Sequence, residues 1–149
     1  MRYLVTYRDP ETGAAALHAA QGMARPGDEV AVIHVFEPHE APWGHGTAAF
    51  VEETEQHMDE REASVADAVR EAGLEAEIVV DVAAPGEGTA RRIAREAAER
   101  DSGMVIVVSK RASGVLGRLL GSVAQGLLEV SPAPVLVIRP PGSEAEPQP

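Results

Sequence analysis

The sequence predicts a doubly wound α/β domain, in which helices cover both faces of a five-stranded, mostly parallel sheet. Five short apolar segments rich in valine and isoleucine are spread along the chain and are typical of buried strands. Segments with helical periodicity separate them, and parallel neighbouring strands require such crossover helices. The chain has 149 residues, 44% of them hydrophobic, which is sufficient for the core of one domain.

The first strand leads directly into a helix. Residues 3–7 form a short apolar, β-prone run, and the Asp9-Pro10 pair that follows is typical of a helix start, with an acid at the N-cap and proline at the first helical position. We expect this helix to run to about Ala24. Residues 25–28, Arg-Pro-Gly-Asp, favour a tight turn, and residues 30–36 are therefore expected to form the second strand.

A loop rich in proline, glycine and histidine comes next, followed by a long helix expected over residues 48–72. Gly73 suits a left-handed cap at the end of that helix. Its apolar stripe is formed by Val51, Met58, Val65, Val69 and Ala72. The loop contains His39 and His45 near two glutamates, but this spacing fixes no coordination geometry, and we expect no metal site there.

The C-terminal half continues the alternation of strands and helices. Strands are expected at residues 78–82, 104–108 and 135–138, with the fourth helix running from about Arg118 to Val130. The third helix presents an apolar face formed by Ala90, Ile93, Ala94 and Ala97, and its arginines Arg91, Arg92 and Arg95 are expected to be solvated. The apolar face of the fourth helix is formed by Leu120, Val123, Leu127 and Val130. Residues 1–139 are thus expected to be one domain, and residues 140–149 a disordered tail rich in proline and glutamate.

The composition limits the partners and the chemistry. The 24 acidic residues exceed the 13 basic ones, and a net charge of -11 repels phosphate backbones and anionic membranes, so we expect neither nucleic acid nor membrane as a partner. Cysteine is absent, which excludes disulfides, thiol catalysis and thiolate zinc sites. Residues 1–20 contain no continuous apolar run of the kind that a signal peptide needs, and we therefore expect a cytoplasmic protein.

The segment from the fourth strand to the fifth contains Gly114, the run Leu119-Leu120-Gly121-Ser122-Val123 and the final strand with its flanks, residues 134–139. In these residues it resembles the signature half of the universal stress protein A family. Weaker matching pieces lie at residues 3–7, at Val32-Ile-His-Val-Phe36 and at the helix that contains Ile93, so the resemblance spans nearly the whole chain before the tail.

The resemblance implies a Rossmann-like fold of the adenine nucleotide alpha hydrolase type, with strand order 3-2-1-4-5. In such sheets a ligand binds beyond the carboxyl ends of the strands where the order reverses, here between the first and fourth strands. The ligand implied is ATP or AMP, with no metal except Mg²⁺ accompanying ATP. The implied nucleotide-binding residues are Tyr7, Arg8, Asp9, Val35, Ser109, Lys110, Arg111, Gly114, Gly121 and Ser122.

The chain departs from the pattern of the family members that bind ATP at two places. Their glycine-rich loop, G-x2-G-x9-G followed by serine or threonine, keeps only its end here, as Gly121-Ser122; Val108 and Arg111 occupy the earlier glycine positions. Those glycines let the backbone approach a phosphate closely. The family's acid at the end of the first strand is replaced by Arg8, with Asp9 displaced by one position.

Each candidate residue also has a purely structural interpretation. Ser122 at a helix start can bind an anion or simply shape the helix, and Asp9 is more simply explained as a cap than as a ribose contact. Lys110, Arg111 and Arg118 form a basic cluster that can attract phosphate or remain solvated. We expect His34, inside the second strand, to be a packed core residue.

Three hypotheses for function remain at this stage. The first is a nucleotide-binding stress-response protein, and the second is a member of the same family that has lost the nucleotide and acts as a dimeric interaction module. The third, an ATP-consuming enzyme, lacks support because no nucleophile elbow, Walker A lysine or paired carboxylates are present; we expect no enzymatic activity, although weak ATPase activity stays open. In proteins that this chain resembles, the final strand pairs with its copy, which implies a homodimer through Val135, Leu136, Val137 and Ile138.

Overall fold

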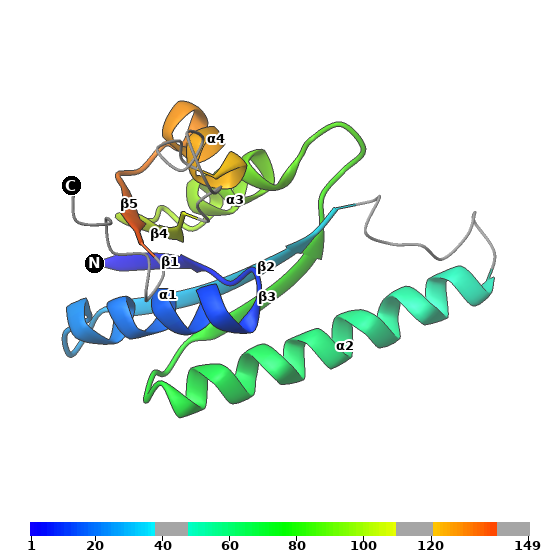
Figure 1. Ribbon diagram of the computed structural model, residues 1–149, viewed down its shortest axis with the longest axis horizontal. Coiled ribbons are helices and arrows are strands. Elements are labelled where there is room, and N and C mark those ends of the chain that lie inside the picture. The colour runs from blue at the N-terminus through cyan, green and yellow to red at the C-terminus, as the bar shows by residue number, and fades with distance from the viewer. Residues whose placement is uncertain (38–47, 110–120, 140–149) are drawn as a thin grey trace, which may run out of the picture.

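The computed structural model describes residues 1–37, 48–109 and 121–139, with the side chains of residues 48–54 omitted. These residues form five strands and four helices that alternate along the chain (Figure 1). The strands are β1 (Arg2–Thr6), β2 (Glu29–Phe36), β3 (Glu77–Val82), β4 (Met104–Val108) and β5 (Val135–Ile138). The helices are α1 (Pro10–Met23), α2 (Ala48–Glu71), α3 (Thr89–Glu99) and α4 (Ser122–Val130).

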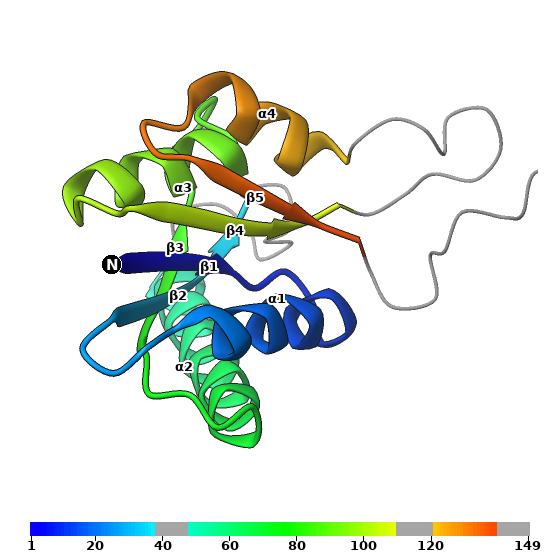
Figure 2. The same cartoon turned by 90° about the vertical axis from the view of Figure 1, so that its left-hand side faces the viewer.

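The strands form one parallel sheet in the order β3-β2-β1-β4-β5, which confirms the fold class expected from the sequence and the strand order that the family resemblance implies. β1 is central and pairs with β2 on one side and β4 on the other. The helices α1 and α2 cover one face of the sheet, and α3 and α4 cover the opposite face (Figure 2). The chain therefore winds outward from β1 in both directions.

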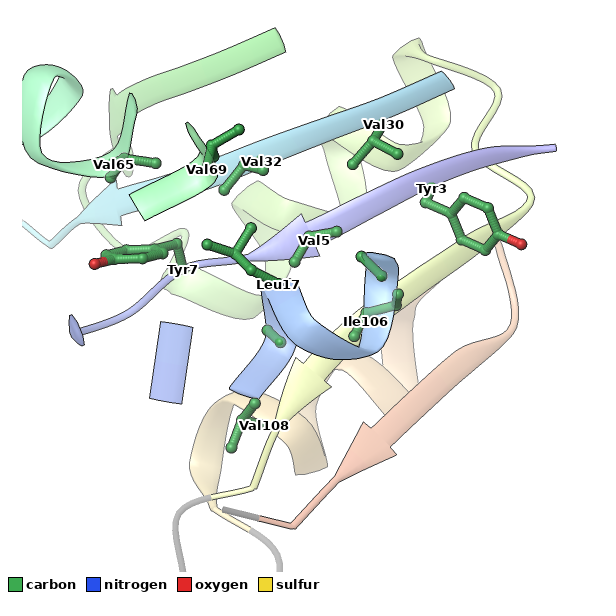
Figure 3. Close-up of a cluster of buried hydrophobic side chains, with 12 residues drawn as sticks. Tyr3, Val5, Tyr7, Leu17, Val30, Val32, Val65, Val69, Ile106 and Val108 are labelled. Carbon is green, nitrogen blue, oxygen red and sulfur yellow. The ribbon is translucent and has the colours of Figure 1, made fainter. Parts of the chain in front are cut away.

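Two apolar clusters hold the three layers together, one on each face of the sheet. Alternate residues of the central strand β1 belong to different clusters. Val5 packs toward α1 and α2 (Figure 3), whereas Leu4 packs toward α3 and α4. Leu17 of α1 and Leu127 of α4 are fully buried on their respective faces. This division explains why the strand segments read as nearly continuous apolar runs, because a parallel sheet with both faces covered offers no solvent side.

Local turn chemistry places the start of α1 and the end of α2 as predicted. Asp9 is the N-cap of α1 and Pro10 its first residue. Gly27 and Gly73 have φ values of 93° and 72°, a left-handed backbone that favours glycine, at the turn before β2 and at the end of α2. None of the helices in the described ranges is both long and apolar enough to cross a membrane.

Three expectations for the helices were wrong. The fourth helix begins at Ser122, with Gly121 as its N-cap, rather than at about Arg118. Arg92 is not solvated: it is 5% exposed, and it donates to Asp81 Oδ2 at 2.7 Å and to Glu96 Oε1 at 3.1 Å. Asp81 belongs to the edge strand β3, so this guanidinium joins α3 to the sheet, a contact that no local pattern indicates. Val130 is exposed rather than part of the buried face of α4, because the helix ends there and the chain turns toward β5.

Candidate functional site

The candidate site lies beyond the carboxyl ends of β1 and β4, where the sheet reverses its strand order. The chain leaves β1 into α1 on one face of the sheet, and it continues from β4 toward α4 on the other face. Two neighbouring strands whose connections go to opposite faces leave a crevice between them. Figure 3 shows Tyr7 and Val108, which mark the two strand ends at this crevice.

The turn from β1 into α1 is held at three points. Tyr7 N–H donates to Ile33 C=O at 2.9 Å and forms the last rung between β1 and β2. Asp9 Oδ1 accepts from Thr12 N–H at 2.9 Å, which is the contact that an N-cap acid makes. Gly13 lies against the buried ring of Tyr7, since a Cβ at residue 13 would be only 2.3 Å from Tyr7 Cε2. The backbone of the intervening Arg8 is therefore fixed, while its side chain is exposed at the crevice.

Burial raises the pKa of the Tyr7 hydroxyl above its ordinary value. The positive charge of Arg61 opposes this increase, and the carboxylates of Asp9 and Glu71 add to it. Tyr7 is therefore a neutral hydroxyl at physiological pH. Its ring supports the turn rather than supplying a charge to a ligand.

His34 of β2 is buried, as expected, but it also lines the crevice. The side chain is 6% exposed, and its Nδ1 lies 2.8 Å from Tyr7 C=O. A carbonyl can only accept, so Nδ1 carries the proton in this contact. The ring also packs edge-on against Phe36, with 4.7 Å between the ring centroids. His34 thus ties the end of β2 to the turn after β1.

At the end of β2, the backbone N–H and C=O groups of one residue point toward the crevice. Successive residues of a strand direct their N–H and C=O groups alternately to the two neighbouring strands. Phe36 C=O accepts from Ala83 N–H at 2.8 Å on the β3 side, and Ile33 C=O faces β1. Val35 therefore directs its N–H and C=O toward β1, beyond the last rung at Tyr7.

A carboxylate from the end of β2 satisfies the start of α3. Glu37 Oε1 accepts from Thr89 Oγ1 at 2.5 Å and from Thr89 N–H at 3.3 Å. The N-cap residue of α3 is Gly88, which offers no side-chain cap, and a negative charge at a helix N-terminus is favourable. The contact spans 52 residues and fixes α3 relative to the end of β2.

The start of α4 is fixed by the residue that follows β4. Ser109 is buried; its N–H donates to Ile138 C=O at 2.9 Å, and its Oγ accepts from Gly121 N–H at 3.1 Å. Gly121 is the N-cap of α4 and has an extended backbone with no side-chain cap. Ser122, the first residue of the helix, is exposed. The N-terminal end of α4, with its free N–H groups, consequently faces the crevice.

The crevice contains a cavity of about 270 Å³. It is lined by Arg8, His34, Val35, Glu37, Thr89, Ser122 and Val123. A second cavity of about 270 Å³ adjoins it between α3 and α4 and shares Glu37, Thr89, Ser122 and Val123 with it. A third, of about 30 Å³, lies between the ends of β1, β2 and β4 and shares Arg8, Val35, Thr89 and Val123 with the first cavity.

Two larger hollows lie elsewhere, and their chemistry fits an anionic ligand poorly. One, of about 590 Å³, separates α1 from α2 and includes Asp67 and Glu71. The other, of about 540 Å³, lies at the amino ends of the strands and includes Glu29, Glu77 and Glu99. Among the described residues, no group of three or more histidine, aspartate or glutamate side chains is arranged to hold a metal ion.

The comparison with protein families decides the identity of this fold. The model of the universal stress protein family matches residues 1–139. The chain belongs to the universal stress protein family. Comparison with curated proteins finds no match.

Solved structures of universal stress proteins share the fold at low sequence identity. A universal stress protein in complex with cAMP is 20% identical, with a TM-score of 0.65 over 94% of this chain and 97% of that one. One from Archaeoglobus fulgidus in complex with dAMP is 21% identical, with a TM-score of 0.64 over 93% and 97%. A family member from Arabidopsis thaliana with AMP bound is 12% identical, with a TM-score of 0.59 over 97% and 94%.

In this universal stress protein, the residues predicted for the site take different positions around the crevice. Arg8, Val35 and Ser122 line the main cavity, and Tyr7 lines the small one between the strand ends. Asp9, Ser109 and Gly121 lie behind them and hold the turn and the start of α4. Lys110, Arg111, Gly114 and Arg118 lie outside the described residues. The expected homodimer through β5 stays a prediction; β5 is an edge strand of this chain's sheet.

Sequence reasoning missed several lining residues, among them Thr12, Glu37, Thr89 and Val123. A signal was available for two of them. Glu37 directly follows β2 and Thr89 begins α3, so each lies at the carboxyl end of the sheet, where ligands bind. Thr12 and Val123 are ordinary inward positions of helices, and only the packing brings them to the crevice.

Proposed function

We propose that this universal stress protein binds an adenine nucleotide, AMP or ATP, in the crevice between β1 and β4. The observation that carries the proposal is the cavity of about 270 Å³ that brings together Arg8, Val35 and Ser122. Arg8 offers a guanidinium to a phosphate, and Ser122 adds a hydroxyl at the N-terminal end of α4, where an anion is favoured.

The base has a matching partner in β2. An adenine presents a donor and an acceptor side by side on one edge, and the peptide edge of Val35 offers an acceptor and a donor with the same spacing. The ligands in the related structures, cAMP, dAMP and AMP, support the same class of ligand. Glu37 places a carboxylate on the cavity wall, which disfavours additional phosphates, so AMP is the first candidate and ATP the second.

A second candidate is a dimeric interaction module without a nucleotide. Two observations favour it: Val108 and Arg111 stand where the ATP-binding pattern has glycine, and β5 is an edge strand of half-buried apolar residues. In that case ligand binding is absent, and the response to stress depends on the surface of the dimer.

Titration of the purified protein with nucleotides separates the two candidates. We expect AMP to raise the melting temperature progressively, because a ligand that binds only the native state stabilises it by about 2.7 kcal/mol at a hundred times its Kd. For a chain of this size that corresponds to roughly 5–10 °C. ATP is tested with and without Mg²⁺, and each series is repeated at low and high salt.

Arg8→Ala tests the assigned cation. We expect it to weaken AMP binding about tenfold, because a charge-assisted hydrogen bond at the rim of the cavity is lost. Arg25→Ala is the matched control, since Arg25 is also exposed but lies in the turn at the opposite end of the sheet. The absence of any shift with AMP, ATP or cAMP at either salt concentration would favour the interaction module.

A further inference from the structure

A groove of about 590 Å³ lies between α1 and α2, apart from the nucleotide crevice. One wall is a face of α1 between Pro10 and His18, and the other is a face of α2 between Ser64 and Ala72. At the rise of an α-helix each wall is about 12 Å long. The side chain of Tyr7, from the turn after β1, also lines the groove. We call this cavity the α1–α2 groove.

The floor of the α1–α2 groove is apolar. Leu17 of α1 is fully buried there, and Ala68 and Ala72 of α2 are half-buried. Alanine side chains are too small to fill the space between the two helices. An aliphatic chain that lies along this floor would remove apolar surface from water, which favours binding.

The hydroxyl of Tyr7 is an unpaired polar group in this groove. Tyr7 is 4% exposed, and its ring extends away from β1 beside Val65 of α2 (Figure 3). Within the part of the chain that the structure describes, no group hydrogen-bonds to this hydroxyl. It is not one of the two unpaired atoms that are fully enclosed there, Thr12 Oγ1 and Arg92 Nη1, so its oxygen retains accessible surface. Glu71, whose charge acts on the hydroxyl, lines the same groove.

The charges along the α2 wall are negative. Asp67 and Glu71 are both exposed, and they lie one helical turn apart, about 6 Å along the axis. Asp67 is paired with Arg70, but both side chains are more than half exposed, and such a surface pair contributes little. Arg61 stacks on the ring of Phe36, 5.5 Å from its centroid, and does not line the groove. The α1–α2 groove therefore favours a cation.

The apolar floor and the acceptors together define the ligand chemistry. A compact metal cation could use the two carboxylates but not the apolar floor, and no cluster of metal-ligating side chains occurs among the described residues. An aliphatic chain with ammonium groups three or four carbons apart matches both the floor and the spacing of one helical turn between the carboxylates. An ammonium group can also donate to the Tyr7 hydroxyl, which a neutral tyrosine accepts.

We propose that the α1–α2 groove binds a linear aliphatic polyamine. The methylene chain lies on Leu17 and the alanines of α2, and the ammonium groups bind the Tyr7 hydroxyl, Asp67 and Glu71. This site is separate from the crevice between β1 and β4, and it does not depend on the proposed nucleotide binding. Because the ligand contacts both helices only in the folded protein, it stabilises the native state.

Titration of the full chain with spermidine tests the proposal. Calorimetry is carried out at about 0.15 M ionic strength, where interactions between distant surface charges are screened. Mg²⁺ supplies a double charge without an aliphatic chain, and 1,8-octanediol supplies the chain without a charge. We expect one saturable site for spermidine and at least about tenfold weaker binding of either control.

A variant that fills the groove separates this site from general attraction to an acidic surface. Ala14 is exposed and lines the groove, so Ala14→Leu occupies it without changing the charge. We expect the spermidine affinity of Ala14→Leu to fall at least about tenfold. Ala63→Leu is the matched control, because Ala63 is exposed on α2 but does not line the groove.

Two further variants test the polar contacts. We expect Glu71→Gln and Tyr7→Phe each to weaken spermidine binding by about three- to tenfold, because each removes one hydrogen bond to an ammonium group. Glu62→Gln removes the same charge from an exposed position of α2 outside the groove, and its affinity should stay within about twofold of the original protein.

Three results would overturn the proposal. One is the absence of spermidine binding, and another is binding that Ala14→Leu leaves within about twofold or that Glu62→Gln weakens as much as Glu71→Gln, which indicates surface charge alone. The third is a trilysine peptide that binds the groove at least about tenfold more tightly than spermidine, which indicates a basic protein segment as the occupant. Failure of the protein to bind AMP, ATP or cAMP refutes the proposed function and leaves this site unaffected.

Discussion

Replacing Gly13 with alanine tests the packing that positions the site. The Cβ of an alanine at residue 13 would lie 2.3, 2.4 and 2.8 Å from three ring carbons of Tyr7. Carbon atoms in contact normally lie about 3.5–4.0 Å apart, so the ring or the helix must move by more than about 1 Å. Tyr7 is buried between α1 and α2, where such movement displaces other side chains.

The cost of this movement exceeds the gain in helix propensity. Overpacking a buried contact costs about 1–3 kcal/mol, and alanine in place of glycine within a helix returns about 1 kcal/mol. We therefore expect Gly13→Ala to lower the free energy of unfolding by up to about 2 kcal/mol. Gly22→Ala is the matched control in the same helix, because nothing lies within 4 Å of its Cβ position, and it should stabilise by about 0.5–1 kcal/mol.

Urea unfolding and thermal melts of both variants measure the contrast. At roughly 2–4 °C per kcal/mol, the two melting temperatures should differ by several degrees, with Gly13→Ala the lower. Gly13→Ala in a Tyr7→Ala background should lose its penalty, because the ring that causes the clash is gone. If Gly13→Ala stabilised the protein as much as Gly22→Ala, the close approach would not exist, and the argument that it fixes the turn before α1 would be wrong.

Two further predictions concern the charged contacts of α3. Arg92→Met should lower the free energy of unfolding by about 2–4 kcal/mol, measured by urea unfolding. The reason is that Glu96, which is 7% exposed, loses one of its two arginine partners. Adding Glu96→Leu should recover most of this loss, because no buried carboxylate is then left without that partner. A persistent loss in the double variant would contradict this. Arg100 holds the pKa of Glu77 below its usual range through two hydrogen bonds. The stabilisation from Glu77 is therefore fully present above about pH 4.3, the pKa of an unfolded glutamate, and it is lost as the pH falls through the lower pKa of Glu77 in the folded state. Unfolding of Glu77→Gln and the original protein from pH 7 to pH 2 should show a difference in stability that disappears in acid; a difference independent of pH would refute the ion pair as its source.

Much of the local structure followed from local patterns. The start of α1 was predictable because Asp9 accepts from a backbone N–H only three residues away and Pro10 suits the first helical position. The end of α2 was predictable because Gly73 readily adopts the left-handed backbone that ends a helix. The strands were equally clear, since a sheet with both faces covered requires nearly continuous apolar runs. The start of α4 was not predicted correctly: the helix was expected from about Arg118 and begins at Ser122, with Gly121 as its N-cap.

The site was predictable only in part. The family resemblance named Arg8, Val35 and Ser122 as site residues, and all three line the same cavity. Arg92 was misjudged because a helical arginine looks solvated until the edge strand that bears Asp81 is in position. The partner of each such group lies far along the chain, and no local spacing encodes it.

The sequence by itself determined the alternation of strands and helices, the two-sided burial of the sheet and the family. These properties depend on periodicity and on capping contacts that act over a few residues. Only the tertiary structure decided that Glu37 binds Thr89, 52 residues away, that Val35 directs its N–H and C=O toward the crevice, and that Arg92 of α3 binds Asp81 of β3. These features depend on the register between strands and on the seating of helices, which are fixed when the whole core packs.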